Sequence, residues 1–317
     1  MTNESVILAF DTSNYTTSVA IMNTDGKLIA NLKKMLPVKT GERGLRQSEA
    51  LFHHTVNIPE LMRQAEVYLA DKKIIAVGVS DKPRNQEGSY MPCFLAGLSA
   101  ASAISSSQKI PLYRFSHQCG HIMAALYSSD RVDISSREFA AFHISGGTTE
   151  LVRAVSTDAG FNVNIVMDTA DLNAGQVIDR VGVHMGLAFP AGPELEKLAK
   201  LNDKKIPRKK ISISSNGINL SGLENMAVSL YKDTNDSSLT AAFVFDYLGR
   251  AISAMCEKYT ELYGKSTFIF AGGVMCNSII RRMLSSSYEA YFAEPAMSAD
   301  NAVGIAALAL RAHLEKM

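Results

Sequence analysis

The sequence predicts an α/β protein built from two related lobes. The first observation is an internal repeat: residues 9–17 read AFDTSNYTT and residues 141–149 read AFHISGGTT, so five of nine positions are identical at an offset of 132. The second is that an apolar run typical of a β-strand precedes each window and an alternating run follows it. A strand, a tight turn and a returning strand therefore occur twice, and such a repeat favours two copies of one supersecondary unit. Two ordinary hairpins that match by chance are the alternative.

The elements expected in the first part of the chain make a mixed α/β lobe. Alternating or apolar runs predict strands, and apolar residues spaced along one helix face predict helices. In chain order we expect strands over 6–10, 18–22 and 27–31, a helix over 48–70, a strand over 74–79 and a helix over 94–106. This order is typical of a mixed α/β lobe. We assign residues 1–113 to this lobe and expect a C-terminal helix, 300–317, to complete it.

The second lobe is expected over residues 114–299 and repeats the same logic. Its expected strands are 139–142, 151–155 and 266–271, and its expected helices are 117–127, 173–186, 194–201, 239–263 and 278–286. A chain of 317 residues is long enough to bury two cores.

Composition excludes several classes of function. The net charge is +1, so no whole-molecule field favours nucleic acid or a membrane. The first residues have neither a basic segment nor a long apolar run, and the apolar run 302–310 is shorter than the roughly 18 residues that a membrane span needs. The four cysteines are widely spaced and form no C-x-x-C pair, which is typical of reduced thiols. We therefore expect a cytoplasmic protein that does not associate with membranes.

Two histidines have the spacing needed to bind one metal ion. His117 and His121 lie at i and i+4 of an expected helix, so both are on one helix face about one turn apart. Two imidazoles are too few, and a third ligand must come from elsewhere. Asp300, just before the last apolar run, is the candidate, because two histidines and a carboxylate suit iron or zinc and leave positions open for substrate oxygens. The alternatives are unrelated surface histidines and an aspartate that caps the last helix.

Glycine turns and two acids indicate a nucleotide site. The repeated turns can offer backbone N–H groups and hydroxyls to a phosphate, and Gly272-Gly273 separate a strand from a helix whose N-terminus favours anions. Asp171 and Asp179 flank Gly175, and an acid can accept from ribose hydroxyls. Gly192 lies in a P-A-G-P turn that can admit a ribose or a base edge. Each feature also has an ordinary interpretation as a solvated acid, a common Gly-Gly turn or the start of a helix.

Seven short motifs occur in one order along nearly the whole chain. They are the repeated turns, H-x-x-x-H, D-x(7)-D, P-x-G-P, S-G-L (221–223), A-G-G-V-x-x-N (271–277) and D-N-A (300–302). This order resembles the glycoprotease-like family, the universal tRNA threonylcarbamoyladenosine synthases. The resemblance implies the actin-like ATPase (ASKHA) fold, two RNase H-like lobes with a cleft between them. It also implies transfer of a threonylcarbamoyl group from threonylcarbamoyl-adenylate to N6 of the tRNA adenosine adjacent to the anticodon.

The resemblance also assigns residues and partners. It implies one divalent metal, iron or zinc, on His117, His121 and Asp300. It implies contacts to ATP or the adenylate from Asp11, Ser145, Gly146, Gly147, Thr148, Asp179, Gly192, Glu196 and Asn277, where Glu196 stands at a position that is usually Asp. The candidates for catalytic residues are Asp11 and Ser145, and no general base is named. The implied partners are tRNA, a related actin-like subunit, a P-loop ATPase and small accessory proteins.

Several substrate-loop positions depart from the family's pattern. Thr148 replaces the histidine of S-G-G-H-T, and Gln176 replaces an acid of D-D-A-A-G-E-A-F-D-K, so a side chain that exchanges protons is lost. The stretch at 45–53 and the loop at 84–90 also differ. A non-catalytic nucleotide-binding paralog, acting as a partner or regulator in a tRNA-modification complex, is therefore the alternative function. A metalloprotease is a third interpretation, but the chain lacks the glutamate of H-E-x-x-H.

One segment could bind RNA despite the balanced overall charge. Residues 197–210 hold seven Lys or Arg among fourteen residues. Phosphate contacts from such a segment would bind tRNA through counterion release. A solvated helix end and loop is the alternative.

Overall fold

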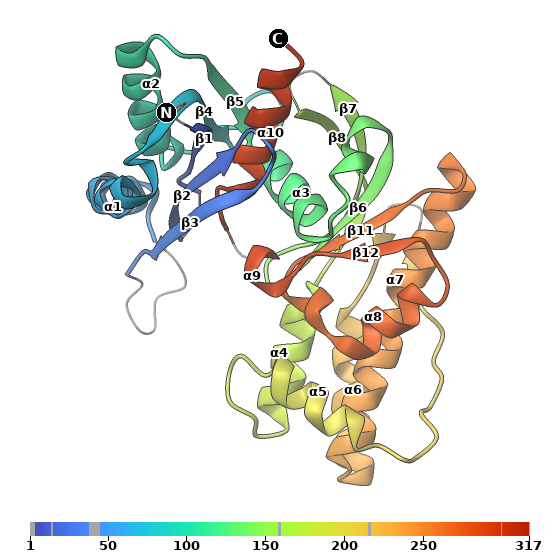
Figure 1. Ribbon diagram of the computed structural model, residues 1–317. Coiled ribbons are helices and arrows are strands. Elements are labelled where there is room, and N and C mark those ends of the chain that lie inside the picture. Colours follow the sequence, from blue (N-terminus) through green and yellow to red (C-terminus); the bar gives the residue numbers. More distant parts are fainter. Residues whose placement is uncertain are drawn as a thin grey trace. The chain divides into compact units, whose positions relative to one another are not determined.

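The chain divides into two compact units (Figure 1). The computed structural model describes residues 4–13, 15–37, 45–157, 160–214, 217–298 and 300–316, so Asn14 of the first repeated turn and Ala299 lie outside the described residues. Unit 1 comprises Met1–Ser136, Val155–Val163 and Ala296–Met317, and unit 2 comprises Arg137–Ala154 and Asn164–Pro295. The division therefore falls after Ser136 and not after residue 113 as expected.

Unit 1 is built on a five-stranded sheet in the order β3-β2-β1-β4-β5. The strands are β1 (Glu4–Asp11), β2 (Thr16–Asn23), β3 (Leu28–Met35), β4 (Lys72–Lys82) and β5 (Leu112–Ser116). The first three are antiparallel neighbours, whereas β4 runs parallel to β1, and β5 runs parallel to β4. The four strands expected in this lobe are confirmed, and β5 is an additional strand.

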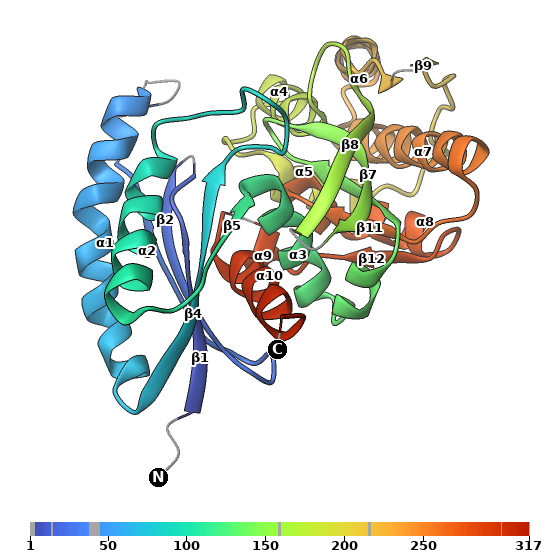
Figure 2. The same cartoon turned by 90° about the horizontal axis from the view of Figure 1, so that it is seen from above.

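Helices cover both faces of this sheet (Figure 2). The helices α1 (Gln47–Leu69) and α2 (Phe94–Gln108) lie on one face, and α3 (His117–Ser128) and α10 (Val303–Leu314) lie on the other. Because β1 is central and covered on both sides, its apolar run is continuous rather than alternating, and every residue from Val6 to Phe10 is fully buried. The expected helices over 48–70, 94–106 and 117–127 are confirmed within one or two residues.

The contact between α3 and α10 explains why α3 belongs to unit 1 and not to the second lobe. A Cβ atom built on Gly304 of α10 would lie 1.8 Å from the carbonyl oxygen of Gly120 in α3. One built on Gly120 would lie 2.8 Å from the side chain of Ile305. The two backbones therefore touch, and only glycine permits this approach.

Unit 2 repeats the sheet order of unit 1. Its seven strands follow the order β12-β11-β6-β7-β8-β10-β9, in which β8, β7, β6, β11 and β12 correspond to β3, β2, β1, β4 and β5. The strands are β6 (Phe139–Ile144), β7 (Thr149–Thr157), β8 (Gly160–Thr169), β9 (Ile213–Ser214), β10 (Gly217–Ile218), β11 (Phe268–Ala271) and β12 (Ala290–Phe292). The directions also match, since β7 is antiparallel to β6, β11 is parallel to β6, and β12 is parallel to β11. The repeat in the sequence is therefore confirmed as a repeat of topology.

The helices of unit 2 pack around one long core helix. They are α4 (Ala174–His184), α5 (Gly192–Lys200), α6 (Ser221–Thr234), α7 (Ser237–Tyr263) and α8 (Ser278–Ser285), and the short helices η1 (Val132–Ser136), η2 (Gly273–Cys276) and α9 (Pro295–Ser298) complete the described helices of the chain. The core helix α7 contacts α5, α6 and α8. By length and composition α7 could cross a membrane, but 78% of its most apolar window is buried inside the protein, as in the core helix of a soluble protein.

Candidate functional site

Three parallel strands of unit 1 bring polar side chains to one edge of the sheet. Asp11 ends β1, Ser80 lies near the end of β4, and His117 follows β5 directly as the first residue of α3. The register pairs Phe10 with Val79, so Ser80 comes next to Asp11. The carboxyl edge of a parallel sheet is where α/β proteins gather functional groups.

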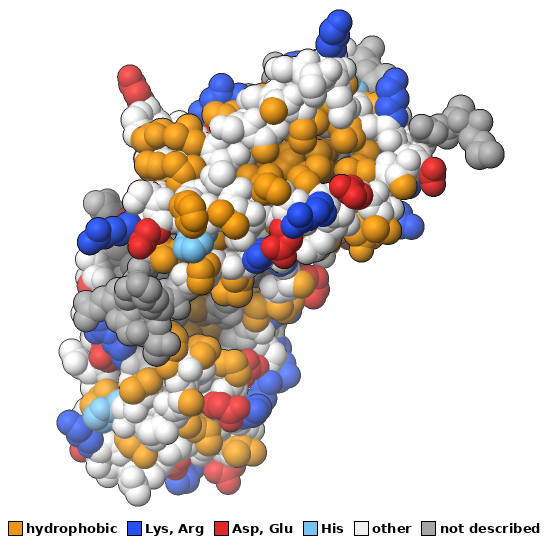
Figure 3. Space-filling model, turned by 90° about the vertical axis from the view of Figure 1, so that its left-hand side faces the viewer, with side chains coloured by type: hydrophobic (Ala, Val, Ile, Leu, Met, Phe, Trp, Pro, Cys, Tyr) orange, Lys and Arg blue, Asp and Glu red, His pale blue; other side chains and the backbone are white. Residues whose placement is uncertain are grey.

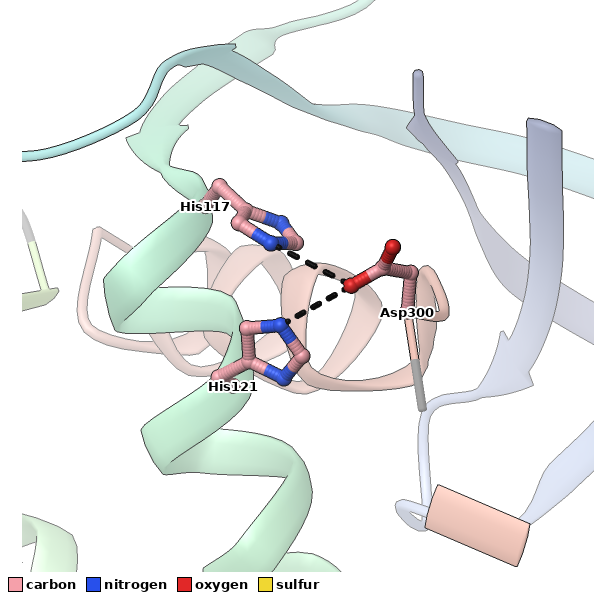
Figure 4. A group of neighbouring side chains, drawn as sticks. All are labelled: His117, His121 and Asp300. Carbon is pink, nitrogen blue, oxygen red and sulfur yellow. Dashed lines mark hydrogen bonds and ion pairs between the residues drawn. The ribbon is translucent and has the colours of Figure 1, made fainter. Parts of the chain in front are cut away.

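The two histidines and Asp300 converge as the sequence predicted (Figure 4). His121 Nε2 lies 3.2 Å from Asp300 Oδ1, and His117 Nε2 lies 3.5 Å from the same oxygen. The imidazole centroids are 4.3 Å apart, with the rings edge to face. Both rings extend from α3 one turn apart and point to the segment that precedes α10 (Figure 4).

Asp300 does not cap the last helix. The cap position is Ala302, and it is the neighbouring Asn301 whose Oδ1 accepts from the Val303 N–H at 3.0 Å. The Ala302 N–H donates to the Ser18 hydroxyl of β2, which fixes the start of α10 on the sheet. The Asp300 carboxylate is therefore left to the histidines, and the capping interpretation is wrong.

The charges of this cluster support one another. Burial acts to lower the pKa of His117, but the carboxylates of Asp11 and Asp300 outweigh burial and raise it to about 10. Burial acts to raise the pKa of Asp300, but the two histidines hold it far below its usual range. The pKa of Asp11 is likewise lowered against burial, through the charge and hydrogen bond of His117. The His117 ring is thus held between two carboxylates, that of Asp11 at Nδ1 and that of Asp300 at Nε2.

The residues fit a metal with nitrogen and oxygen ligands. Among the described residues, His117, His121 and Asp300 form a group whose three ligand atoms all lie within 4.8 Å of one another. Two imidazoles and one carboxylate suit zinc or iron and leave positions for substrate. Cys119, between the two histidines, is not part of the group: its Sγ donates to the Phe161 carbonyl at 3.4 Å, and burial raises its thiol pKa.

Asp11 is a component of the same cluster. Its side chain is 1% exposed, and Oδ2 accepts from His117 Nδ1 at 2.8 Å. Its other oxygen, Oδ1, accepts from the Ser80 hydroxyl at 2.8 Å and from the Ser13 N–H at 3.0 Å. The resemblance marked Asp11 as a nucleotide contact and a candidate catalytic residue. In the structure both of its oxygens accept hydrogen bonds, and one of the donors is the candidate metal ligand His117.

The second copy of the repeat, in unit 2, is a turn closed by its own serine. The Ser145 Oγ accepts from the N–H groups of Gly147 and Thr148 at 3.2 and 3.1 Å, and the Ser145 N–H donates to the Thr148 carbonyl at 2.8 Å. A Cβ atom on Gly146 or Gly147 would meet nothing within 4 Å, so the outer side of the turn is open. An anion bound on this open side could therefore accept from the Gly147 and Thr148 N–H groups in place of the Ser145 hydroxyl.

Two glycines of other segments approach this turn at backbone distance. A Cβ atom on Gly175 would lie 2.7 Å from the Gly146 nitrogen, and the Gly175 N–H donates to the Ser145 carbonyl at 3.1 Å. Gly272 has φ +98°, and a Cβ atom there would lie 2.3 Å from the Ile144 carbonyl. The segments around Gly175 and Gly272 therefore both pack against the backbone of the turn at Ser145.

Other predicted nucleotide residues form short chains of contacts within unit 2. Asp179 Oδ1 accepts from the Ala191 N–H at 2.8 Å, which holds the turn that leads into Gly192 and α5. One turn further, Glu196 accepts from the N–H and hydroxyl of Ser278 at the start of α8. Asn277 caps α8, with Oδ1 accepting from the Ile279 and Ile280 N–H groups. Asp179, Glu196 and Asn277 therefore have structural partners besides any ligand.

Two positions of the D-x(7)-D motif are explained by helix starts. Asp171 accepts from the N–H groups of Leu220 and Ser221, so it joins this motif to the S-G-L motif at the start of α6. Gln176 Oε1 accepts from the Asn173 N–H and closes a capping box at the start of α4. The Gln176 amide oxygen therefore accepts the capping hydrogen bond that a glutamate would accept at this position. The sequence alone did not indicate this role.

The fold defines the class of the protein. The chain is similar to HypF from T. kodakarensis, with a TM-score of 0.63 at 12% identity over 99% of this chain and 48% of that one. It is also similar to component A of the (R)-2-hydroxyglutaryl-CoA dehydratase of Acidaminococcus fermentans, with a TM-score of 0.54 at 14% identity over 96% and 98% of the two chains. At these identities the likeness concerns the fold alone, which is the actin-like ATPase fold that the resemblance implied.

The family follows from the sequence. Residues 32–307 match the family model TsaD, described as tRNA N6-adenosine threonylcarbamoyltransferase. A protein of that name from Streptococcus pneumoniae (strain CGSP14) is 31% identical over 293 residues, covering 88% of this chain and 83% of the relative. One from Streptococcus suis (strain 05ZYH33) is 32% identical over 305 residues, covering 90% and 85%. The chain belongs to the TsaD family.

Proposed function

We propose that this protein transfers a threonylcarbamoyl group from threonylcarbamoyl-adenylate to N6 of the tRNA adenosine adjacent to the anticodon, with one divalent metal, iron or zinc, in the site. The observation that carries the proposal is the convergence of His117 Nε2 and His121 Nε2 on Asp300 Oδ1 in a chain of this family. In the reaction the adenine amine forms a bond to the carbamoyl carbon, the bond from that carbon to the adenylate phosphate oxygen breaks, and the amine loses a proton.

The chain's own residues supply binding and orientation. His117, His121 and Asp300 would hold the metal, which when bound would polarise the carbamoyl carbonyl. In unit 2, the N–H groups of Gly147 and Thr148 would donate to the adenylate phosphate in place of the Ser145 hydroxyl, to which they now donate.

The nucleoside part of the donor would bind to the acidic and amide side chains of unit 2. Asp179 uses Oδ1 for the Ala191 N–H, and its Oδ2 would accept a ribose hydroxyl beside Gly192. The Asn277 Nδ2–H group of the side-chain amide would donate a hydrogen bond to an acceptor atom of the adenylate, because Oδ1 is engaged in the cap of α8. Glu196 of α5 already accepts from Ser278 and pairs with Lys200, so it would act by holding the start of α8 against α5.

The alternative is a nucleotide-binding paralog without catalysis, which partners or regulates a tRNA-modifying complex. Thr148 and the altered segments at 45–53 and 84–90 favour it, because side chains of the family's pattern are missing there. Gln176 does not, because its amide keeps the capping bond to Asn173. For a metalloprotease, the residues between the two histidines are Gln118, Cys119 and Gly120, none of which is a general base.

We also propose the partners tRNA, a related actin-like subunit, a P-loop ATPase and small accessory proteins, and a cytoplasmic location.

An apolar surface on α1 and α2 supports a protein partner. A groove of about 420 Å³ lies between these helices, and apolar side chains gather over them in Figure 3. Phe52 and Val56 of α1 are 63% and 54% exposed beside it. Exposed apolar patches of this kind mark interfaces. Phe52→Glu should abolish co-purification with the actin-like subunit, whereas Val183→Glu, an exposed valine of α4, should not.

The test is reconstitution with unmodified tRNA, threonine, bicarbonate, ATP, a donor-forming enzyme and the candidate partners, followed by mass spectrometry of the tRNA nucleosides. Formation of N6-threonylcarbamoyladenosine that depends on this chain supports the transferase. No modified nucleoside, together with adenylate binding measured by calorimetry, would instead support the non-catalytic paralog.

A further inference from the structure

The Asp11 carboxylate accepts a hydrogen bond from His117, one of the candidate metal ligands. This carboxylate is buried at the end of the central strand β1, and three donors point at it: His117 Nδ1 at 2.8 Å, the Ser80 hydroxyl at 2.8 Å and the Ser13 N–H at 3.0 Å. A carboxylate in this setting accepts all three bonds and donates none. The proton of the shared bond therefore lies on His117 Nδ1.

The position of that proton decides what the other nitrogen of His117 can do. A neutral imidazole protonated at Nδ1 has its lone pair on Nε2, the atom that lies 3.5 Å from Asp300 Oδ1 and faces the group of candidate ligands. The opposite tautomer would carry a proton at Nε2 and could not bind a metal through it. We infer that Asp11 is a positioning residue that fixes the Nδ1–H tautomer and the ring orientation of His117, so that Nε2 is presented to the metal.

The register of the sheet in unit 1 brings Ser80, Asp11 and His117 together. Ser80 reaches Asp11 because β4 runs parallel to β1 with Val79 opposite Phe10, and His117 is adjacent because β5 runs parallel to β4 and α3 begins where β5 ends. The hydrogen bond from Ser80 fixes one oxygen of Asp11, which leaves the other for His117. A carboxylate behind a metal-binding histidine orients the ring and increases its basicity, and its removal typically weakens metal affinity by about 10–100-fold.

The inference rests on the metal site of the proposed function, and its test separates the two. Zn²⁺ affinity is measured by competition with a chromophoric chelator for the wild type, Asp11→Asn, Asp11→Ala and the control Asp81→Asn, an acid of the same strand edge that pairs with Arg114. Affinity should fall about 10–100-fold in Asp11→Ala. It should fall less in Asp11→Asn, whose amide oxygen can still accept from Nδ1, and it should stay unchanged in Asp81→Asn.

A second measurement does not depend on any variant folding. Long-range ¹H–¹⁵N correlation spectra of the Zn²⁺-loaded wild type report which nitrogen of His117 carries the proton. A protonated Nδ1 with a metal-bound Nε2 is expected. Coordination through Nδ1, or wild-type affinity in a folded Asp11→Ala, would overturn the inference while the metal site stands. A wild type that takes up no metal would overturn both.

Discussion

The close contact between α3 and α10 gives the sharpest structural prediction. In Gly304→Ala the new methyl group would lie 1.8 Å from the Gly120 carbonyl oxygen and 2.7 Å from the Ala124 nitrogen, whereas an ordinary contact starts at 3.4 Å. Both neighbours are backbone atoms and cannot rotate away, so α10 must move from α3 by about 1–2 Å at a cost of about 3 kcal/mol. Because Asp300 lies only three residues before Val303, the first residue of α10, the movement also carries its carboxylate away from the two histidines.

The assay is thermal unfolding together with metal content. Gly304→Ala should lower the Tm of unit 1 by roughly 5–10 °C and should bind less than one metal per chain. The matched control is Gly222→Ala in α6, where a methyl group meets nothing within 4 Å and alanine favours the helix by up to about 1 kcal/mol. A Gly304→Ala protein with the Tm and metal content of the wild type would refute this account of the helix contact.

Three further predictions concern unit 2. Asp171→Ala should lower the free energy of unfolding by about 1 kcal/mol at pH 7 through loss of a helix-start contact. Although burial opposes it, the bonds from Ser221 and Leu220 lower the folded-state pKa of Asp171. In urea unfolding the difference from wild type should therefore be complete above the unfolded pKa of about 3.9 and be lost progressively as the pH falls from there through the folded-state pKa. Asp179→Ala should weaken adenylate binding by about 1–3 kcal/mol, and equal affinities by calorimetry would reject the contact. Replacing five basic residues of the 197–210 segment by Gln should weaken tRNA binding and flatten its salt dependence in filter binding; the residues are Lys204, Lys205, Arg208, Lys209 and Lys210. Unchanged affinity and salt dependence would show that tRNA does not bind through this segment.

The sequence predicted those parts of the fold that leave a local pattern. The repeated windows at 9–17 and 141–149 fall on matching strands of two sheets with one order, and the apolar runs predicted the central strands of both. The lobe boundary leaves no such pattern, because α3 joins unit 1 through glycines 184 positions apart in the chain, Gly120 and Gly304. Such a contact is a property of packing and not of periodicity.

The candidate site was predicted by residue type but not by role. The spacing of His117 and His121 fixed the shared helix face, and chemistry selected Asp300. The hydrogen bond from His117 to Asp11 could not be predicted from the sequence, because it depends on the parallel register of β1, β4 and β5. The apparent loss of an acid at Gln176 is explained by a capping bond that the resemblance alone did not indicate.

The most direct test of the proposed metal-dependent transferase measures tRNA modification as a function of the metal bound. Metal-free protein is titrated with Fe²⁺ or Zn²⁺ in the reconstituted reaction, and N6-threonylcarbamoyladenosine is quantified by mass spectrometry for the wild type and His121→Ala. We expect the amount of product to rise with added metal up to one ion per chain, and we expect His121→Ala neither to hold the ion nor to form product. A wild type that holds one ion per chain, with donor, partners and tRNA present, and still forms no modified nucleoside would contradict this proposal.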